Sequence, residues 1–372
     1  MKILAPLSSP KPDAIKARRQ AGAQELYFGL ASNAWAQQFG TYCNLNRMSD
    51  FGSRANTVDE TRAASAARSI HAEGCAAFVT LNAGLYEAEQ LEYLKELCHT
   101  LAVGDTKDIG ISARNHTAHS AENVKECTKA RASNNTDGSD MTDENAAQSI
   151  SVPDGIIVST RALGRIVAEA GLSPVASTML DACNADVVRA LRNVGFRRII
   201  VPREISLDEI GALTAAFPDM EFEAFLMRDG CMFSDSHCFA RHLPGHGALC
   251  GSLRLSERRF LRANDACGFG AVHNSELTDE LYRRFYMKRA CGLCAIYRLL
   301  HMGVAAVKVV GRADNEQELL ADIALVRRNL NIAKRAASEK EYLDAMEFPP
   351  DRAATCKLGL NCYYPEVRFP LS

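Results

Sequence analysis

The sequence predicts an α/β fold in which eight β/α units close into a (β/α)8 barrel. Eight short runs rich in apolar and β-branched residues recur along the 372-residue chain, and helical apolar spacing follows most of them. Repeated β/α units imply parallel strands joined by right-handed crossovers, and eight of them favour a closed barrel over an open sheet. A hydrophobic content of 47% is sufficient for a large core.

The elements are expected to alternate along residues 1–335. The expected strands cover residues 2–4, 25–28, 76–81, 155–159, 174–178, 198–201, 221–226 and 305–310. The expected helices cover residues 13–21, 58–72, 87–101, 163–170, 185–194, 207–215 and 315–334.

Two segments lie outside this pattern. Residues 104–152 are polar and contain the run NNTDGSD, which predicts a flexible surface insertion in the barrel. Residues 336–372 contain Cys356 and Cys362 and are too few for a domain. We expect this C-terminal tail to pack back across the barrel.

The chain has no sign of export or of a membrane span. No apolar stretch near the N-terminus suits a signal peptide, and no window approaches the roughly 18 apolar residues of a membrane helix. We therefore expect a cytoplasmic protein. Its 13 cysteines cannot all pair as disulfides and are expected to be thiols. A net charge of −2 predicts no overall attraction for nucleic acid.

Residues 231–294 hold six of the cysteines and begin just after the expected strand 221–226, so they approach the barrel mouth, where barrel enzymes carry their chemistry. Zinc could bind four thiolates, or thiolates together with a histidine from His237, His242 or His246. A redox pair at Cys291 and Cys294 is a second possibility, disfavoured by the charged helical run before it. An iron–sulfur cluster tolerates long loops between its ligands. Spacing alone leaves zinc and iron–sulfur open.

The flanking motifs resemble the U32 peptidase family. Cys231 and Cys238 are separated by six residues, a glycine precedes Cys250 by three, and Cys294 lies in the run GLCAI. The run KVVGR at 308–312 is similar to the family's KIEGR, QELYFG at 24–29 to ADAVYLG, and PREISLDEI at 202–210 to AREL-S-L-EEI. The chain departs from the pattern at Met227 and Arg228, where the family often has His-Gly, and at Val310, where it has glutamate.

This resemblance implies a barrel that binds a [4Fe–4S] cluster through Cys231, Cys238, Cys250 and Cys294. It also implies oxygen-independent hydroxylation of a small aromatic or quinone-like molecule, or of an RNA base, with prephenate as the oxygen donor. Two alternatives remain: a collagenase-like peptidase with a structural cluster, and a non-catalytic subunit that partners a second U32 protein. No Gly-x-Ser-x-Gly or His-Glu-x-x-His motif supports a peptidase.

Four further residues are candidates for the site. Arg203 and Glu204 follow a strand and could bind substrate or transfer a proton, or could form an internal ion pair. Lys308 and Arg312 flank the last strand, where barrels often bind anions. Cys267 and Cys291 are expected to be spare thiols, and the roles of Cys356 and Cys362 stay open.

Basic residues also concentrate near the cysteines, and they would suit a phosphate backbone, a small dicarboxylate or a negatively charged cluster. They are Arg241, Arg254, Arg258, Arg259, Arg262, Arg283, Arg284, Lys288 and Arg289. Because no RNA-binding module is visible, the sequence favours a small-molecule substrate slightly over RNA.

Overall fold

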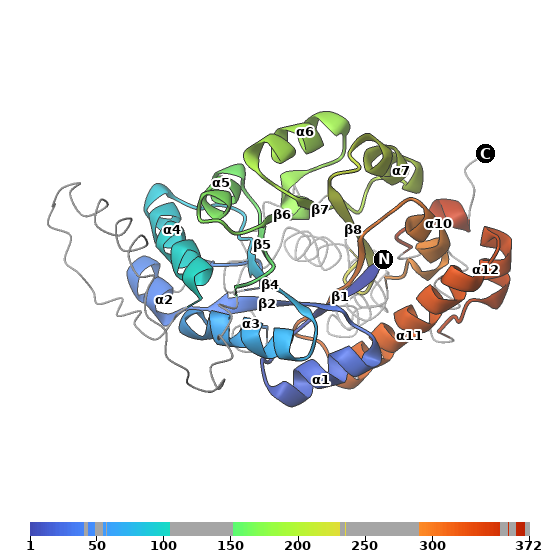
Figure 1. Ribbon diagram of the computed structural model, residues 1–372, viewed down its shortest axis with the longest axis horizontal. Coiled ribbons are helices and arrows are strands. Elements are labelled where there is room, and N and C mark those ends of the chain that lie inside the picture. The colour runs from blue at the N-terminus through green and yellow to red at the C-terminus, as the bar shows by residue number, and fades with distance from the viewer. Residues whose placement is uncertain are drawn as a thin grey trace, which may run out of the picture.

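A computed structural model shows a closed barrel of eight parallel strands with helices outside it (Figure 1). It describes residues 1–40, 44–48, 55–56, 58–104, 152–230, 235, 290–349, 356 and 362–368. The barrel strands are β1 Lys2–Pro6, β2 Glu25–Ala31, β4 Ala76–Leu81, β5 Gly155–Val158, β6 Pro174–Ala176, β7 Arg198–Ile200, β8 Glu221–Met227 and β9 Ala306–Val309. Strand β1 pairs with both β2 and β9, which closes the barrel. The predicted fold class is confirmed.

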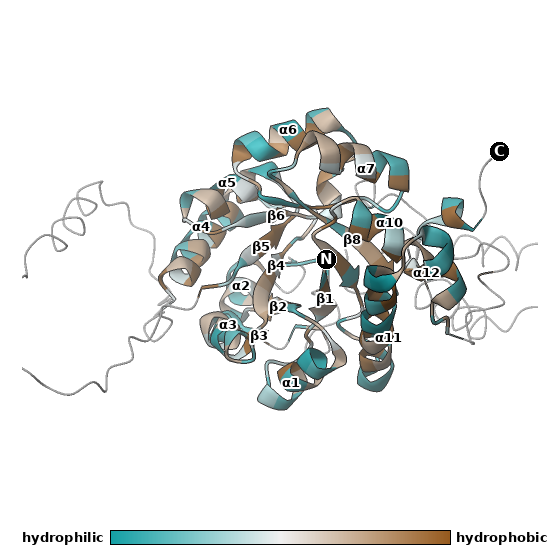
Figure 2. Ribbon diagram, turned by 45° about the vertical axis from the view of Figure 1, so that its right-hand side comes forward, coloured by the Kyte–Doolittle hydropathy of each residue, from teal (hydrophilic) through white to brown (hydrophobic). Residues whose placement is uncertain are grey.

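Amphipathic helices surround the strands. They are α1 Pro12–Ala21, α2 Asn33–Phe39, α3 Ala63–Ala72, α4 Ala88–Val103, α5 Arg161–Glu169, α6 Ala185–Val194, α7 Leu207–Ala216, α10 Ile296–His301, α11 Glu316–Arg335 and α12 Glu339–Ala345. Hydrophilic and hydrophobic residues mix along these helices (Figure 2), and α7 buries Leu207, Ile210 and Leu213 at helical spacing. A capping box between Ser206 and Glu209 sets the start of α7. Within the described ranges, no helix is both long enough and apolar enough to cross a membrane.

The helix expected over residues 58–72 starts later than predicted. Its first residues form the short strand β3, Val58–Asp59, which pairs with the end of β2, and then a 3-10 turn, Glu60–Arg62. The Asp59 side chain accepts a hydrogen bond from the Thr61 backbone N–H, which favours a turn over a continuous helix. Helices α2 and α12 were not predicted, because each spans only seven residues.

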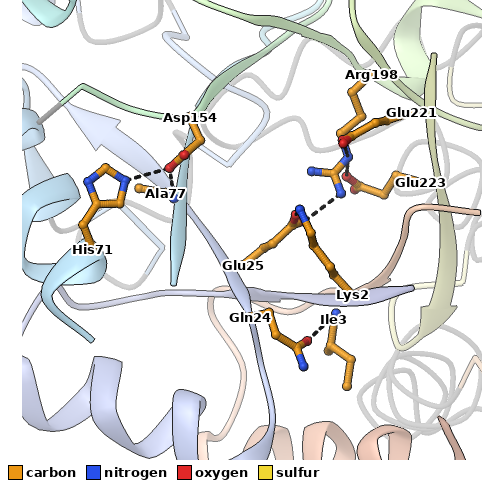
Figure 3. A network of polar contacts seen from close by, with 10 residues as sticks. All are labelled: Lys2, Ile3, Gln24, Glu25, His71, Ala77, Asp154, Arg198, Glu221 and Glu223. Carbon is orange, nitrogen blue, oxygen red and sulfur yellow. Dashed lines mark hydrogen bonds and ion pairs between the residues drawn. The ribbon is translucent and has the colours of Figure 1, made fainter. Parts of the chain in front are cut away.

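A chain of buried ion pairs lies inside the lower half of the barrel, the half formed by the N-terminal ends of the strands; Figure 3 shows Glu25, Arg198 and Glu223 of this chain. Glu25 lies 2.7 Å from Arg198, and Arg198 lies 3.3 Å from Glu223. The second Glu223 oxygen accepts a 2.9 Å hydrogen bond from Lys308. Burial lowers the pKa of Lys308, and the charge of Glu223 opposes that shift. These paired side chains occupy space that apolar side chains fill in many barrels.

Removing one partner of this chain should strongly destabilise the barrel. Glu223→Gln leaves Arg198 and Lys308 buried with one carboxylate fewer, and we expect the free energy of unfolding to fall by about 3–5 kcal/mol. Urea denaturation followed by circular dichroism measures the change. Arg192→Ala, which removes a half-exposed pair with Asp219, is the control and should have little effect. Equal stability of the two variants would contradict a structural role for the buried chain.

Candidate active site at the barrel mouth

The end of β8 organises the mouth of the barrel. Residues 290–292 run antiparallel to it, with hydrogen bonds from the Arg228 N–H to the Ala290 carbonyl (2.8 Å) and from the Gly292 N–H to the Leu226 carbonyl (2.8 Å). This pairing places Cys291 beside the C-terminal end of β8. The chain then enters a 3-10 turn, Leu293–Ala295, and helix α10. Cys294 therefore lies on the face of the barrel that carries catalytic residues in this fold.

Arg228 turns the chain at this point in a left-handed conformation (φ 68°), which is uncommon for residues other than glycine. Its guanidinium is buried and contacts three carboxylates, those of Asp314 (2.9 Å), Asp322 (2.7 Å) and Glu318 (3.3 Å). These ion pairs tie the end of β8 to the start of α11 and stabilise the strained backbone. Arg228, which stands where the family often has the glycine of a His-Gly pair, thus has a structural role.

Two cysteine thiols meet at the rim. Cys294 is 6% exposed and its thiol hydrogen-bonds to that of Cys362 in the C-terminal tail. The contact raises the pKa of Cys294 and lowers the pKa of Cys362 to about 7, as expected when two thiols share a proton. Both are free thiols. Arg368 adds a nearby positive charge that favours the thiolate form.

The tail is held against the barrel by specific contacts. The Tyr363 hydroxyl donates to the Arg228 carbonyl (2.5 Å), and the Tyr364 hydroxyl donates to the Phe225 carbonyl (2.8 Å). The Glu366 carboxylate accepts a hydrogen bond from the Leu207 N–H at the start of α7 (2.8 Å). Residues 362–368 therefore form part of the mouth.

Arginines line the inner side of the mouth. Arg203 lies 3.7 Å above the Phe225 ring and forms an ion pair with Asp235, which also pairs with Arg47 at 3.0 Å. Burial would raise the pKa of Asp235, but the two arginines hold it below its ordinary value. Tyr363 stacks on Phe225 and hydrogen-bonds to Arg203. Two arginines here share one aspartate.

Arg312 is a buried cation bound by neutral groups. Its guanidinium donates to the side-chain oxygens of Thr80 (2.9 Å), Asn56 (3.2 Å) and Asn46 (3.2 Å). In the part of the chain that the structure describes, no carboxylate lies within ion-pair distance of it. Burial lowers its pKa to about 10, so it keeps its charge at neutral pH. A buried charge held only by neutral acceptors is electrostatically suited to an anionic ligand.

Gly29 makes room for this guanidinium. A side chain at that position would place its first carbon 1.9 Å from Arg312 Nη1 and 2.1 Å from Asn56 Oδ1. The glycine of the run QELYFG, singled out in the sequence, is therefore required for Arg312 to lie across β2.

The structure separates the residues that the sequence grouped as candidates. Arg203 faces the mouth, but its carboxylate partner is Asp235, and the adjacent Glu204 is exposed. Lys308 lies inside the barrel paired with Glu223, below Arg312. Among the described residues, no three His, Cys, Asp or Glu side chains are grouped to hold a metal ion. Several predicted residues lie outside the described residues: Cys231, Cys238, Cys250, Cys267, Arg241, Arg254, Arg258, Arg259, Arg262, Arg283, Arg284, Lys288 and Arg289.

Sequence reasoning missed the contribution of Asp235, Arg47 and Tyr363 to the mouth. Asp235 stands between two of the predicted cysteine ligands, and Tyr363 belongs to the run CYYPE, whose paired aromatics were the available signal in the tail. Arg47 has no comparable signal, since nothing in its neighbourhood of the sequence predicts an ion pair 188 residues away.

At its C-terminal mouth the eight-stranded barrel carries two free thiols, Cys294 and Cys362, and the buried Arg312, which has no carboxylate partner among the described residues. The chain belongs to peptidase family U32, whose model matches residues 116–358. Over 88 residues it is 32% identical to the tRNA hydroxylation protein P of Haemophilus influenzae, a match that covers 23% of this chain and 19% of that protein. It thus spans about a fifth of the length of that relative.

Two solved structures illustrate the structural similarity, which is low. The structure of the U32 peptidase Mk0906 aligns with 62% of this chain and 70% of its own, at 11% identity and a TM-score of 0.36. A structure described as native KDPGal aligns with 92% of this chain and 97% of its own, at 10% identity and a TM-score of 0.37.

The shared proton of the two thiols can be tested in the metal-free chain. A thiolate is the form that iodoacetamide alkylates, so alkylation of Cys362 should rise with pH with a midpoint at a pH of about 7. In Cys294→Ala the contact is lost, and the rise should move toward the ordinary thiol value of about 8.5. Peptide mass spectrometry measures both profiles. Cys98, whose pKa burial raises to about 12, should stay unmodified as an internal control. An identical Cys362 profile in both proteins would disprove the contact.

Proposed function

We propose that this chain is an iron–sulfur enzyme that hydroxylates its substrate without molecular oxygen. Its [4Fe–4S] cluster would be held by Cys231, Cys238, Cys250 and Cys294. The observation that carries the proposal is the place of Cys294: a buried thiol at the C-terminal face of the barrel, beside a mouth lined by arginines. Membership of family U32 and the relative named for tRNA hydroxylation support it.

The described residues fit such a cofactor. Thiolates are the usual ligands of iron–sulfur clusters, and Cys294 and Cys362 are free thiols on the correct face of the barrel. Arg368 lies close enough to both to offset negative charge. When bound, the cluster would supply a redox-active iron centre at the mouth.

The residues of the chain would bind and orient the reactants. Arg312 is held rigidly by three side chains and can donate to a carboxylate at the mouth. Arg203, between Phe225 and Asp235, offers a second positive group. Prephenate, which the family resemblance implies as the oxygen donor, carries two carboxylates and so has charge that matches these arginines.

We favour a base in RNA as the substrate, because the named relative acts in tRNA hydroxylation. A small aromatic or quinone-like molecule is the second candidate, favoured by the depth at which Arg312 is buried. A cytoplasmic location, where thiols stay reduced, belongs to the same proposal. Profiling of RNA nucleosides and metabolites in a deletion strain distinguishes the substrates: a missing hydroxylated nucleoside supports RNA, and an accumulating aromatic precursor supports the small molecule.

The described residues offer little support for a peptidase. His71 bonds to Asp154 at 2.7 Å, but Asp154 directly precedes β5 and so lies at the face opposite the mouth (Figure 3). Cleavage of gelatin by the metal-free chain would restore the peptidase reading. A non-catalytic role beside a second U32 protein would appear as activity that requires both chains.

The cluster proposal predicts that ligand variants lose iron. The anaerobically purified chain should contain about four irons and show broad absorbance near roughly 400 nm. Cys238→Ala and Cys294→Ala should lose both, whereas Cys75→Ala, which removes a buried thiol at the opposite end of the barrel, should keep both. Elemental analysis and absorbance spectroscopy measure the outcome. Zinc in place of iron in the wild-type chain would show that the cluster assignment is wrong.

Arg312 should govern the binding of a carboxylate ligand. Arg312→Gln keeps hydrogen-bonding groups but removes the charge, and we expect affinity for prephenate to fall roughly 10- to 100-fold. Isothermal titration calorimetry measures binding, and circular dichroism checks that the fold is kept. The exposed Arg192→Gln is the matched control. Wild-type affinity in Arg312→Gln would exclude Arg312 from the site.

A further inference from the structure

One buried tyrosine inside the barrel has an unused hydroxyl. Tyr27 is 5% exposed, and among the described residues its hydroxyl has no hydrogen-bond partner. In the same part of the chain, every other buried tyrosine makes a hydrogen bond through its hydroxyl. These are Tyr86, Tyr93, Tyr342, Tyr363 and Tyr364. Because buried polar groups are nearly always hydrogen-bonded, the exception at Tyr27 needs an explanation.

Strand β2 places Tyr27 between the buried ion pairs and the mouth. Glu25, Tyr27 and Gly29 alternate along β2 and so line one face of the strand. Glu25 belongs to the buried ion pairs, and Gly29 lies against the Arg312 guanidinium. From the centre of the Tyr27 ring, Lys308 Nζ lies 4.4 Å away and Arg312 Cζ lies 5.9 Å away. A phenylalanine ring would make the same two contacts, so they do not explain the hydroxyl.

Arg312 also has unused donors. Its hydrogen bonds to Thr80, Asn56 and Asn46 use both Nη1 protons and one Nη2 proton. The Nε–H and the second Nη2–H therefore have no acceptor within the described ranges. Arg312 is as deeply buried as Tyr27, at 5% exposure. Two neighbouring buried side chains thus present donors to which the described chain offers no acceptor.

The Tyr27 hydroxyl keeps its proton at neutral pH. Burial raises the pKa of Tyr27, and the positive charge of Arg312 opposes that shift without cancelling it. Charges on Asp229, Glu223 and Arg203 also act on this pKa. A neutral phenol can donate a hydrogen bond, as the guanidinium does. A ligand with two neighbouring acceptor oxygens would therefore satisfy both side chains.

We infer that Tyr27 is a specificity-determining residue, whose hydroxyl donates a hydrogen bond to a ligand oxygen next to the carboxylate that Arg312 binds. The ligand class that fits is a 2-oxo acid, because its carboxylate and carbonyl oxygens are adjacent and only accept hydrogen bonds. The inference rests on the carboxylate-binding role proposed above for Arg312. It involves neither the cluster nor its cysteine ligands.

The test uses two small acids that differ only in the 2-oxo group, 2-oxobutanoate and butanoate. Their affinities for the full chain are measured by ligand-observed nuclear magnetic resonance titration. The wild type should bind 2-oxobutanoate more tightly. Tyr27→Phe, which keeps the ring contacts with Lys308 and Arg312, should weaken 2-oxobutanoate about 3- to 10-fold and leave butanoate unchanged. Arg312→Gln should weaken both acids.

Tyr297→Phe is the matched control. It removes the hydroxyl of a half-buried tyrosine on α10, outside the barrel, whose ring stacks on His301 at 4.1 Å. This variant should bind both acids as the wild type does, and circular dichroism checks that every variant is folded.

Three outcomes would overturn the inference. They are a wild type that does not prefer 2-oxobutanoate or binds neither acid, wild-type affinity for 2-oxobutanoate in Tyr27→Phe, and an equal loss for both acids in that variant. Iron content, measured separately, tests the proposed function. A chain that lacks iron but distinguishes the acids through Tyr27 would refute the cluster and keep this inference. A chain that holds iron but does not distinguish them would refute the inference alone.

Discussion

The pairing of residues 290–292 with the end of β8 is the interaction on which the mouth depends. Arg228, at the end of this pairing, has a left-handed backbone conformation. Three carboxylates that contact its side chain stabilise this conformation. From this pairing come the positions of Cys291 and Cys294 and the edge to which Cys362 binds. Three main-chain hydrogen bonds connect the barrel, the cysteine motif and the tail: from Arg228 N–H to Ala290, from Gly292 N–H to Leu226, and from Tyr363 N–H to Cys291.

Charge is distributed differently in the two halves of the barrel. In the lower half, the negative charges of Glu25 and Glu223 neutralise the positive charges of Arg198 and Lys308. These four side chains are therefore paired within the protein itself. Near the mouth, the described groups that accept hydrogen bonds from Arg312 are all neutral. This difference is the reason that we propose the mouth as the binding region, because a net buried charge is stabilised when a ligand of opposite charge enters.

Much of the barrel could be predicted from the sequence, because strand and helix periodicities are local signals. The eight strands follow from short β-rich runs, and the helix at 185–194 has the predicted bounds. The helix expected over residues 58–72 begins only at Ala63, because Val58 pairs with Leu30, a contact that the alanine-rich composition of this segment does not indicate. The ion-pair partners of Lys308 and Arg203 could not be predicted. Glu223 and Asp235 are distant in the sequence and come next to them only when the barrel folds. The approach of Cys362 to Cys294 is likewise a long-range contact.

The most direct test of the account is anomalous diffraction at the iron edge from crystals of the anaerobically purified chain. The account predicts iron at the C-terminal mouth of the barrel, bonded to the Cys294 sulfur. No anomalous signal there, with the two thiols still in contact or joined as a disulfide, would contradict it.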